Sequence, residues 1–592
     1  MRRPILASAM LAIAVSTSCA QTVYPVDRAD ILAGSRFDVK VEFPGPVVPG
    51  DAILTVNGAD HTAQFGKTAQ FIEKEAGTEQ SALILRDVSL DKPGEYIVRV
   101  AAPGVSREVR WTVYDTQPRK ARNVVLLIGD GLSLAHRVAA RMLSKGIAEG
   151  KAFGKLAMDD MPQMALVATA GADSIITDSA NSASAYATGH KTAAGAMGVY
   201  ADRTADPFDD PRVETIVSLV KRRNAMAVGL VTDTELQDAT PAAMIAHTRR
   251  RAAYDQIVEQ YFAAQPDVLM GGGLANFLPQ GAPGARRRDQ TDYVAKFKDA
   301  GYAFAANAAN LKALPQDTRR LLGLFNLRNM DGALDRRFLK TGSVKRFSDQ
   351  PDLTEMTAKA LDILSQNPNG FFLMVEAGMI DKYTHLLDME RAVYDTIMFD
   401  NVVRLVRDWS KARGDDTLVL VLADHTHPVA IVGTIDDDMT SEPKVPLRER
   451  VRVYGKAGFP NYPAPDADGY PTRVDVSRRL AMFSASLPDH YETFRPRLDD
   501  PNAPTIPGKE PGTFEANERY RTLPGAMFRS GNLPRFANSS VHSAEDVVLT
   551  ASGPGSEAVR GQLENTDVFR VMAEALGLGQ NTAPTTGGAA PK

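Results

Sequence analysis

The chain has 592 residues, a formal net charge of −4, 44% hydrophobic residues and 24% charged residues. This is the composition of an ordinary globular protein. The slight acidity argues against nucleic acid as a specific partner, because such a partner favours a basic face.

The N-terminus has the pattern of an export signal. Arg2 and Arg3 precede an apolar run over residues 5–15 that ends in "STSCAQ". This predicts a secretory signal peptide over residues 1–20, since the run is too short for a transmembrane span. The alternative is a lipid anchor at Cys19, and both interpretations predict a periplasmic or secreted protein. Cys19 is the only cysteine, so neither an internal disulfide nor a cysteine metal ligand is expected.

Residues 21–116 have the alternating pattern of half-buried strands. Examples are "FDVKVEF" at 37–43, "YIVRV" at 96–100 and "VRWTV" at 109–113. The pattern predicts a small all-β, immunoglobulin-like sandwich. The segment carries no clustered acids or histidines, so we assign it no chemistry and expect it to fold separately.

From residue 123 the pattern changes to continuous apolar runs, including "NVVLLIGDG", "GFFLMVEAG" and "TLVLVLADHTH". Such runs, separated by helix-like stretches, predict a large, mostly parallel central sheet flanked by helices over residues 117–580. Residues 428–537 are rich in proline and charge, and we expect an insertion over the rim of the sheet. Residues 581–592 are predicted to be a disordered tail.

Acids and histidines follow several of these runs directly. In open α/β sheets the site lies beyond the carboxyl ends of the strands, so these side chains should meet. Crowded carboxylates repel one another unless cations neutralise them, which predicts divalent metals. A small-residue helix, "TDSANSASAYATGHKT" at 177–192, would place Ser179 beside them. The residues at the strand ends are Asp130, Asp238, Thr240, Glu376, Asp381, His385, Asp424 and His425.

The residue types indicate which metals. Asp381 and His385 are four positions apart and would share one helix face. Mixed oxygen and imidazole ligands suit a catalytic zinc, and an oxygen-only group suits magnesium. Two metals about 4 Å apart can clamp the entering and leaving oxygens of a phosphoryl displacement. A zinc on Ser179 would make its hydroxyl a stronger nucleophile.

Five motifs in order and spacing resemble the alkaline phosphatase family, from about residue 121 to 427 and again near His542. They are "GDG" at 129–131, "TDSANSASAYATGHKT" at 177–192, "ELQDATPAAMIAH" at 235–247, "VEAGMIDKYTH" at 375–385 and "ADHTH" at 423–427. The resemblance implies an enzyme that hydrolyses small-molecule phosphate monoesters and releases inorganic phosphate.

The resemblance also implies roles for individual residues. Ser179 would become a phosphoserine, Arg251 would grip the phosphate, and Lys382 would contact it through water as in the bacterial Asp/Lys type. Two zinc ions and one magnesium ion would bind per chain. Asp381, His385 and His542 would hold one zinc, Asp130, Asp424 and His425 the other, and Asp130, Thr240 and Glu376 the magnesium, with Asp238 reaching it through water.

Some assignments stay open in the sequence. Arg249, Arg250 and Arg251 are adjacent, so local pattern does not say which faces the site. His490 is a rival to His542, and His427 is expected to support a zinc ligand. The oligomeric state, a homodimer included, also stays open.

Two other functions compete with this one. A phosphodiesterase or sulfatase of the same superfamily is one alternative, but "SANSA" after Ser179 lacks the x-Pro-x-Arg pattern of sulfatases. A non-catalytic, secreted metal-binding module is the other. The number of matched catalytic groups favours the phosphomonoesterase over both.

Overall fold

The computed structural model describes residues 21–438, 447–493, 503–523 and 525–579. The predictions for the signal peptide at 1–20, for Cys19 and for the tail at 581–592 lie outside these residues. No helix within the described ranges is both long and apolar enough to cross a bilayer.

A ten-stranded sheet forms the centre of the molecule, in the order β16-β17-β15-β14-β18-β10-β19-β27-β13-β28. The strands from β16 to β19 are mutually parallel, and β27 runs antiparallel to both neighbours. The predicted α/β fold is therefore confirmed. The strands are β10 (Asn123–Gly129), β13 (Gln163–Ala168), β14 (Ala227–Glu235), β15 (Val268–Gly272), β16 (Ala303–Ala305), β17 (Leu321–Leu324), β18 (Phe371–Ala377), β19 (Thr417–Leu422), β27 (Val547–Ser552) and β28 (Arg560–Glu564).

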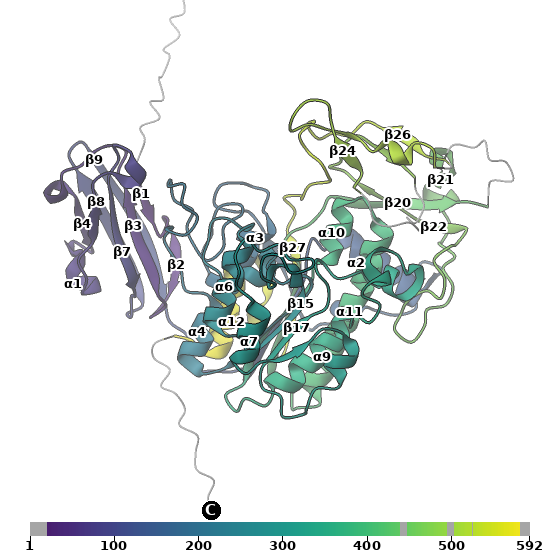
Figure 1. Cartoon of the computed structure of the whole chain (residues 1–592), viewed down its shortest axis with the longest axis horizontal. Helices are drawn as coiled ribbons and strands as arrows, with labels where there is room; N and C mark the ends of the chain where they lie inside the picture. The colour runs from purple at the N-terminus through teal and green to yellow at the C-terminus, as the bar shows by residue number, and fades with distance from the viewer. Residues whose placement is uncertain (1–20, 439–446, 494–502, 524, 580–592) are drawn as a thin grey trace, which may run out of the picture.

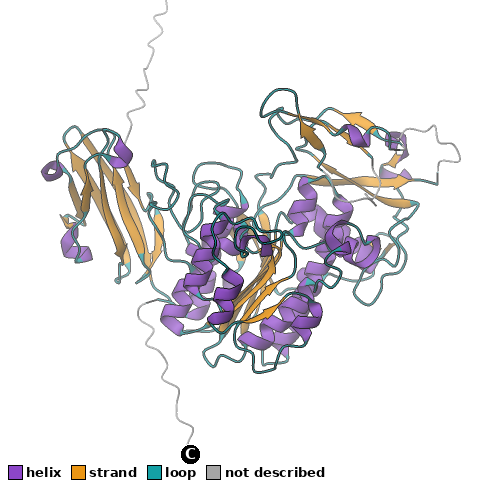
Figure 2. Ribbon diagram, viewed as in Figure 1, coloured by secondary structure: helices purple, strands orange, loops and turns teal. Residues whose placement is uncertain are grey.

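Helices cover both faces of this sheet (Figure 2). This explains the continuous apolar runs, because strands such as β10, β18 and β19 are buried along their whole length. The helices are α2 (Leu134–Lys145), α3 (Ser179–Thr188), α4 (Ile216–Asn224), α5 (Ala239–Ala243), α6 (Tyr254–Ala264), α7 (Tyr293–Asp299), α8 (Ala308–Lys312), α9 (Leu353–Leu364), α10 (Met379–His385), α11 (Met389–Lys411) and α12 (Asn565–Leu576).

The strand register brings the polar residues together. Strands β14, β18, β10 and β19 are neighbours, and Ile128 of β10 pairs with Glu376 on one side and Leu422 on the other. The carboxyl ends of the four strands therefore lie at one edge. Asp130, Asp238 and Asp424 come within a few residues of these ends.

Two sheets with one shared core form the N-terminal β-domain, drawn in purple in Figure 1. Their orders are β1-β3-β7-β6 and β2-β9-β8-β4-β5. The strands are β1 (Thr22–Tyr24), β2 (Ala29–Leu32), β3 (Phe37–Glu42), β4 (Ile53–Val56), β5 (Ala59–Asp60), β6 (Gln70–Ile72), β7 (Ala82–Val88), β8 (Gly94–Ala102) and β9 (Val105–Tyr114), with the short helix α1 (His61–Phe65).

The β-domain contacts the α/β part of the chain through residues 199–214. Tyr200 and Val213 belong to the hydrophobic core of the β-domain. The buried Lys40 of β3 pairs with Asp202 and lies 2.6 Å from Glu75. Because residues 21–116 are expected to fold separately, this junction was not predicted from the sequence.

Small sheets build the insertion that follows β19, at the right of Figure 1. Strand β20 pairs with β21 and β22, β23 with β26, and β24 with β25. The strands are β20 (Val429–Asp436), β21 (Val451–Arg452), β22 (Arg478–Ser484), β23 (His490–Glu492), β24 (Thr505–Pro507), β25 (Phe514–Ala516) and β26 (Met527–Arg529). A separate two-stranded sheet, β11 (Ile147–Ala148) and β12 (Lys151–Ala152), follows α2.

Candidate metal and catalytic site

Ser179 is the first residue of α3, whose ten residues are all buried. The Ser182 hydroxyl donates to the Asp424 carbonyl at 2.6 Å, and Tyr186 donates to the Ala423 carbonyl at 2.9 Å. These bonds hold the helix against the chain that leaves β19, and its small residues allow the close approach. As a result, Ser179 Oγ lies 3.0 Å from His425 Nε2.

One cluster of potential metal ligands surrounds Asp381. Its Oδ1 lies 3.2 Å from His385 Nε2, 3.6 Å from His542 Nε2 and 2.7 Å from His427 Nε2. The ligand atoms of these four residues lie within 4.8 Å of one another. Asp381, His385 and His542 thus meet as the sequence predicts, and His427 contacts the carboxylate of Asp381.

A second cluster lies against Ser179. His425 Nε2 is 3.2 Å from Asp130 Oδ1 and 3.4 Å from Asp424 Oδ2. The rings of His425 and His542 stack with 3.5 Å between their centroids, so the two clusters lie next to each other. Ser179 therefore lies next to the predicted ligands of both zinc ions.

The electrostatics of the clusters suit bound cations. Burial, together with the charges of Asp381 and Asp424, raises the pKa of Asp130. Burial also raises the pKa of Asp424 to about 6, and the charge of Asp381 adds to this. Among the described residues, Asp130 Oδ1 and Thr240 Oγ1 are buried without a hydrogen-bond partner. Crowded carboxylates with free oxygens fit divalent metals.

Glu376, one of the predicted magnesium ligands, contacts two threonines of β14. Glu376 accepts hydrogen bonds from Thr232 and, at 3.1 Å, from Thr234. Burial raises the pKa of Glu376 to about 7. The two threonines were missed by the sequence reasoning, although the "VTDT" that ends β14 was a visible polar interruption of an apolar run.

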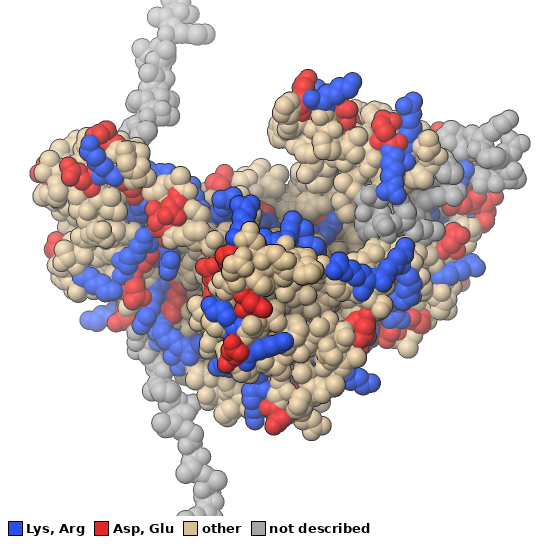
Figure 3. All heavy atoms as spheres, viewed as in Figure 1, with Lys and Arg blue, Asp and Glu red and all other residues tan. Residues whose placement is uncertain are grey.

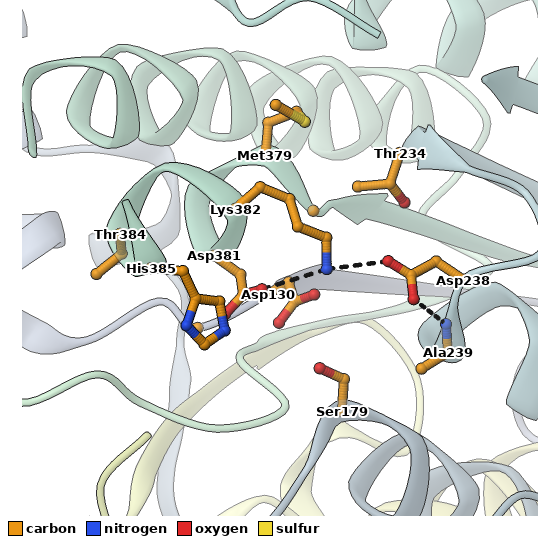
Figure 4. Close-up of polar contacts among 12 residues, drawn as sticks. Asp130, Ser179, Thr234, Asp238, Ala239, Met379, Asp381, Lys382, Thr384 and His385 are labelled. Atoms are coloured by element: carbon orange, nitrogen blue, oxygen red, sulfur yellow. Dashed lines mark hydrogen bonds and ion pairs between the residues drawn. The ribbon is translucent and has the colours of Figure 1, made fainter. Parts of the chain in front are cut away.

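Two cations lie between the carboxylates. Figure 4 shows the Lys382 ammonium between Asp238 and Asp381, at 2.9 Å from Asp238 Oδ2 and 3.3 Å from Asp381 Oδ2. Arg251 donates to Asp178 and, at 2.7 Å, to Asp238 Oδ1. Asp178, directly before Ser179, was not assigned a role from the sequence.

The structure discriminates between the residues that the sequence left open. Arg249 donates to the Asp202 carbonyl at 2.6 Å, away from Ser179, whereas Arg251 faces the site. His490 lies in β23, with Nδ1 at 3.0 Å from the Pro488 carbonyl. His542 Nε2 instead lies 3.2 Å from His385 Nε2.

Known proteins that are similar to this chain include several alkaline phosphatases. The family model described as alkaline phosphatase matches residues 121–448. Alkaline phosphatase H of Pseudomonas aeruginosa (strain UCBPP-PA14) is 35% identical over 353 residues, which cover 53% of this chain and 71% of that protein. Alkaline phosphatase of Escherichia coli (strain K12) is 33% identical, over 53% of this chain and 72% of its own. The crystal structure of Thermus thermophilus alkaline phosphatase superposes with a TM-score of 0.55 at 25% identity, covering 78% of this chain and 93% of that chain.

Proposed function

Because the chain belongs to the alkaline phosphatase family and is a phosphatase, we propose that it hydrolyses phosphate monoesters through a phosphoserine on Ser179. The observation that carries this proposal is the placement of Ser179 Oγ, 3.0 Å from His425 Nε2 and at the N-terminus of a buried helix. A helix N-terminus favours an anion such as phosphate.

The site residues fit two zinc ions and one magnesium ion. Asp381, His385 and His542 would hold the first zinc, and Asp130, Asp424 and His425 the second. Asp130, Thr240 and Glu376 would hold the magnesium, with Asp238 reaching it through water. Bound metals would supply the positive charge that makes the Ser179 hydroxyl more acidic and offsets charge on the phosphoryl oxygens.

In the first step, Ser179 Oγ attacks the phosphorus and loses its proton while the bond from phosphorus to the ester oxygen breaks. The released alcohol takes up a proton. In the second step, water attacks the phosphorus, the bond to Ser179 Oγ breaks, and inorganic phosphate leaves. Ser179 regains its proton, so the enzyme returns to its starting state.

Two cations orient the phosphoryl group in this scheme. Arg251, held by Asp178 and Asp238, presents a planar guanidinium that can donate two parallel bonds to phosphoryl oxygens. Lys382 would contact the phosphate through water. The pattern of a signal peptide over residues 1–20 supports the further proposal that the enzyme is exported and is periplasmic or secreted.

The test is release of inorganic phosphate from p-nitrophenyl phosphate by the purified protein, before and after treatment with a chelator. We expect turnover that the chelator abolishes and that zinc and magnesium restore. Preferred hydrolysis of bis-p-nitrophenyl phosphate would instead indicate a diesterase, and preferred hydrolysis of p-nitrophenyl sulfate a sulfatase. Metal binding without turnover of any of these substrates would indicate the non-catalytic module.

A further inference from the structure

A pocket of about 460 Å³ lies beside Arg251 and takes no part in the chemistry described above. Arg250 and Ala252, the two chain neighbours of Arg251, both line it. Arg286 and Arg288, from the loop that follows β15, line it as well, together with Tyr254 and Phe208.

The three arginines of this pocket are not neutralised by acids. Within the described residues, Arg250, Arg286 and Arg288 have exposed side chains, and no ion pair joins them to a carboxylate. The carboxylate in a surface salt bridge neutralises the charge of its arginine, and these three arginines have no such partner in the part of the chain that the structure describes. The wall they form is therefore positively charged.

Arg287, between Arg286 and Arg288 in the chain, anchors the loop that carries these two arginines. Its side chain is completely buried and lies 2.5 Å from Asp289 Oδ2 and 3.3 Å from Glu259 Oε1. It also donates to the Asp255 carbonyl of α6 at 3.1 Å and lies 3.9 Å from the Asp255 carboxylate. Arg287 thus fixes the loop to α6. It also pairs with Asp255, the acid in the pocket lining, while its neighbours Arg286 and Arg288 remain exposed.

The chain itself joins the pocket to the phosphate-binding groups. Arg250 and Ala252, which line the pocket, come directly before and after Arg251, and Arg251 donates to Asp238 Oδ1 at 2.7 Å. In Figure 3, Lys and Arg side chains gather along the upper edge of the central part of the molecule, in the hollow between the β-domain and the insertion.

We propose that Arg250, Arg286 and Arg288 form an accessory anion subsite, which makes the enzyme prefer phosphate monoesters that carry a second anionic group. This rests on the proposed function, because it needs a scissile phosphate held at Ser179 by Arg251. Arginine forks bind carboxylates and phosphates in two-bond geometry. The second group would be a carboxylate or a phosphate on the alcohol part of the ester.

A matched substrate pair tests this subsite. Glucitol 6-phosphate and 6-phosphogluconate share an open six-carbon chain and differ only in a terminal alcohol or carboxylate. We expect kcat/KM for phosphate release to be about tenfold higher for 6-phosphogluconate, and this preference to shrink as salt screens the exposed charges. Equal kcat/KM values on the two esters would overturn the subsite but leave the proposed function standing.

Variants of the pocket give the second arm of the test. Arg286→Gln/Arg288→Gln should remove most of the preference. Lys312→Gln/Lys345→Gln, which changes the net charge equally at exposed positions outside the pocket lining, should retain it. An equal loss of kcat/KM on both esters in the arginine variant would indicate a structural defect and overturn the subsite. If the wild type released phosphate from neither ester nor from p-nitrophenyl phosphate, the proposed function itself would be wrong.

Discussion

Arg251 Nη2 donates a 2.7 Å hydrogen bond to Asp238 Oδ1, while the other oxygen of the same carboxylate lies 2.9 Å from Lys382 Nζ. Burial opposes ionisation of Asp238, but the charges of Lys382 and Arg251 outweigh it and lower the pKa of this carboxyl. Asp238 therefore stays ionised and holds two cations beside Ser179.

Arg251→Ala should impair monoester hydrolysis more than diester hydrolysis. A monoester has one more terminal oxygen than a diester, so it gains more from the guanidinium fork. Charge-assisted hydrogen bonds contribute roughly 1.5–3 kcal/mol each, so kcat/KM for p-nitrophenyl phosphate should fall by about 10- to 10³-fold.

The comparison uses p-nitrophenyl phosphate and bis-p-nitrophenyl phosphate with metal content checked in each protein. Arg251→Lys, which keeps the charge without the fork, should recover only part of the loss. The same proportional loss on both esters would show that Arg251 does not read the additional oxygen.

Ser179→Ala should abolish the covalent intermediate. Without the hydroxyl no phosphoserine can form, and we expect kcat to fall by about 10³-fold or more. The measurement is trapping of labelled phosphoenzyme at acidic pH together with turnover. Ser184→Ala is the matched control, because Ser184 lies in the same helix and its hydroxyl accepts a bond from the Gly198 amide at 3.0 Å. Phosphoenzyme trapped from the Ser179 variant would refute the assignment.

The sequence allowed the fold and most of the site to be predicted because chemistry and topology coincide at the strand ends. Several apolar runs are followed directly by an acid or a histidine, and a parallel sheet brings those ends to one edge. Asp130, Glu376 and Asp424 could therefore be placed together without any knowledge of long-range contacts.

Other features depend on contacts that no local pattern contains. Arg249 and Arg251 differ only in the direction in which they leave a turn, and the contacts of Arg251 with Asp178 and Asp238 distinguish them. The junction between Lys40 and Asp202 joins residues 162 positions apart. Neither residue type nor spacing could reveal that pairing in a single sequence.

His190 should make the stability of the protein depend on pH. Burial lowers the pKa of its imidazole from the ordinary value of 6.5 to about 4, and its Nδ1 lies 2.6 Å from the Tyr200 hydroxyl. Between these two pKa values the unfolded chain binds a proton that the folded chain does not, so stability falls as the pH falls from 6.5 toward 4. At pH 5 this loss is about 2 kcal/mol.

The measurement compares wild type and His190→Asn by urea unfolding at pH 7.5 and pH 5, with chelator present so that metal release does not contribute. The stability difference between the two proteins should shrink by about 2 kcal/mol at the lower pH. A difference that stays constant with pH would mean that His190 is protonated as readily in the folded as in the unfolded chain.

Lys40→Met should strongly destabilise the protein, although Lys40 is far from Ser179 in the chain. The Lys40 side chain is 2% exposed and pairs with Asp202 and Glu75, which are buried as well. Removing one partner of a buried ionic network leaves unpaired charge and costs about 3–5 kcal/mol of unfolding free energy.

Lys74→Met is the control, because its pair with Glu79 at 2.8 Å is exposed and contributes less than about 1 kcal/mol. Adding Asp202→Asn to Lys40→Met should restore part of the unfolding free energy, since it removes one of the stranded charges. Equal unfolding free energies for the two lysine variants would show that the junction between the β-domain and residues 199–214 does not depend on this ion pair.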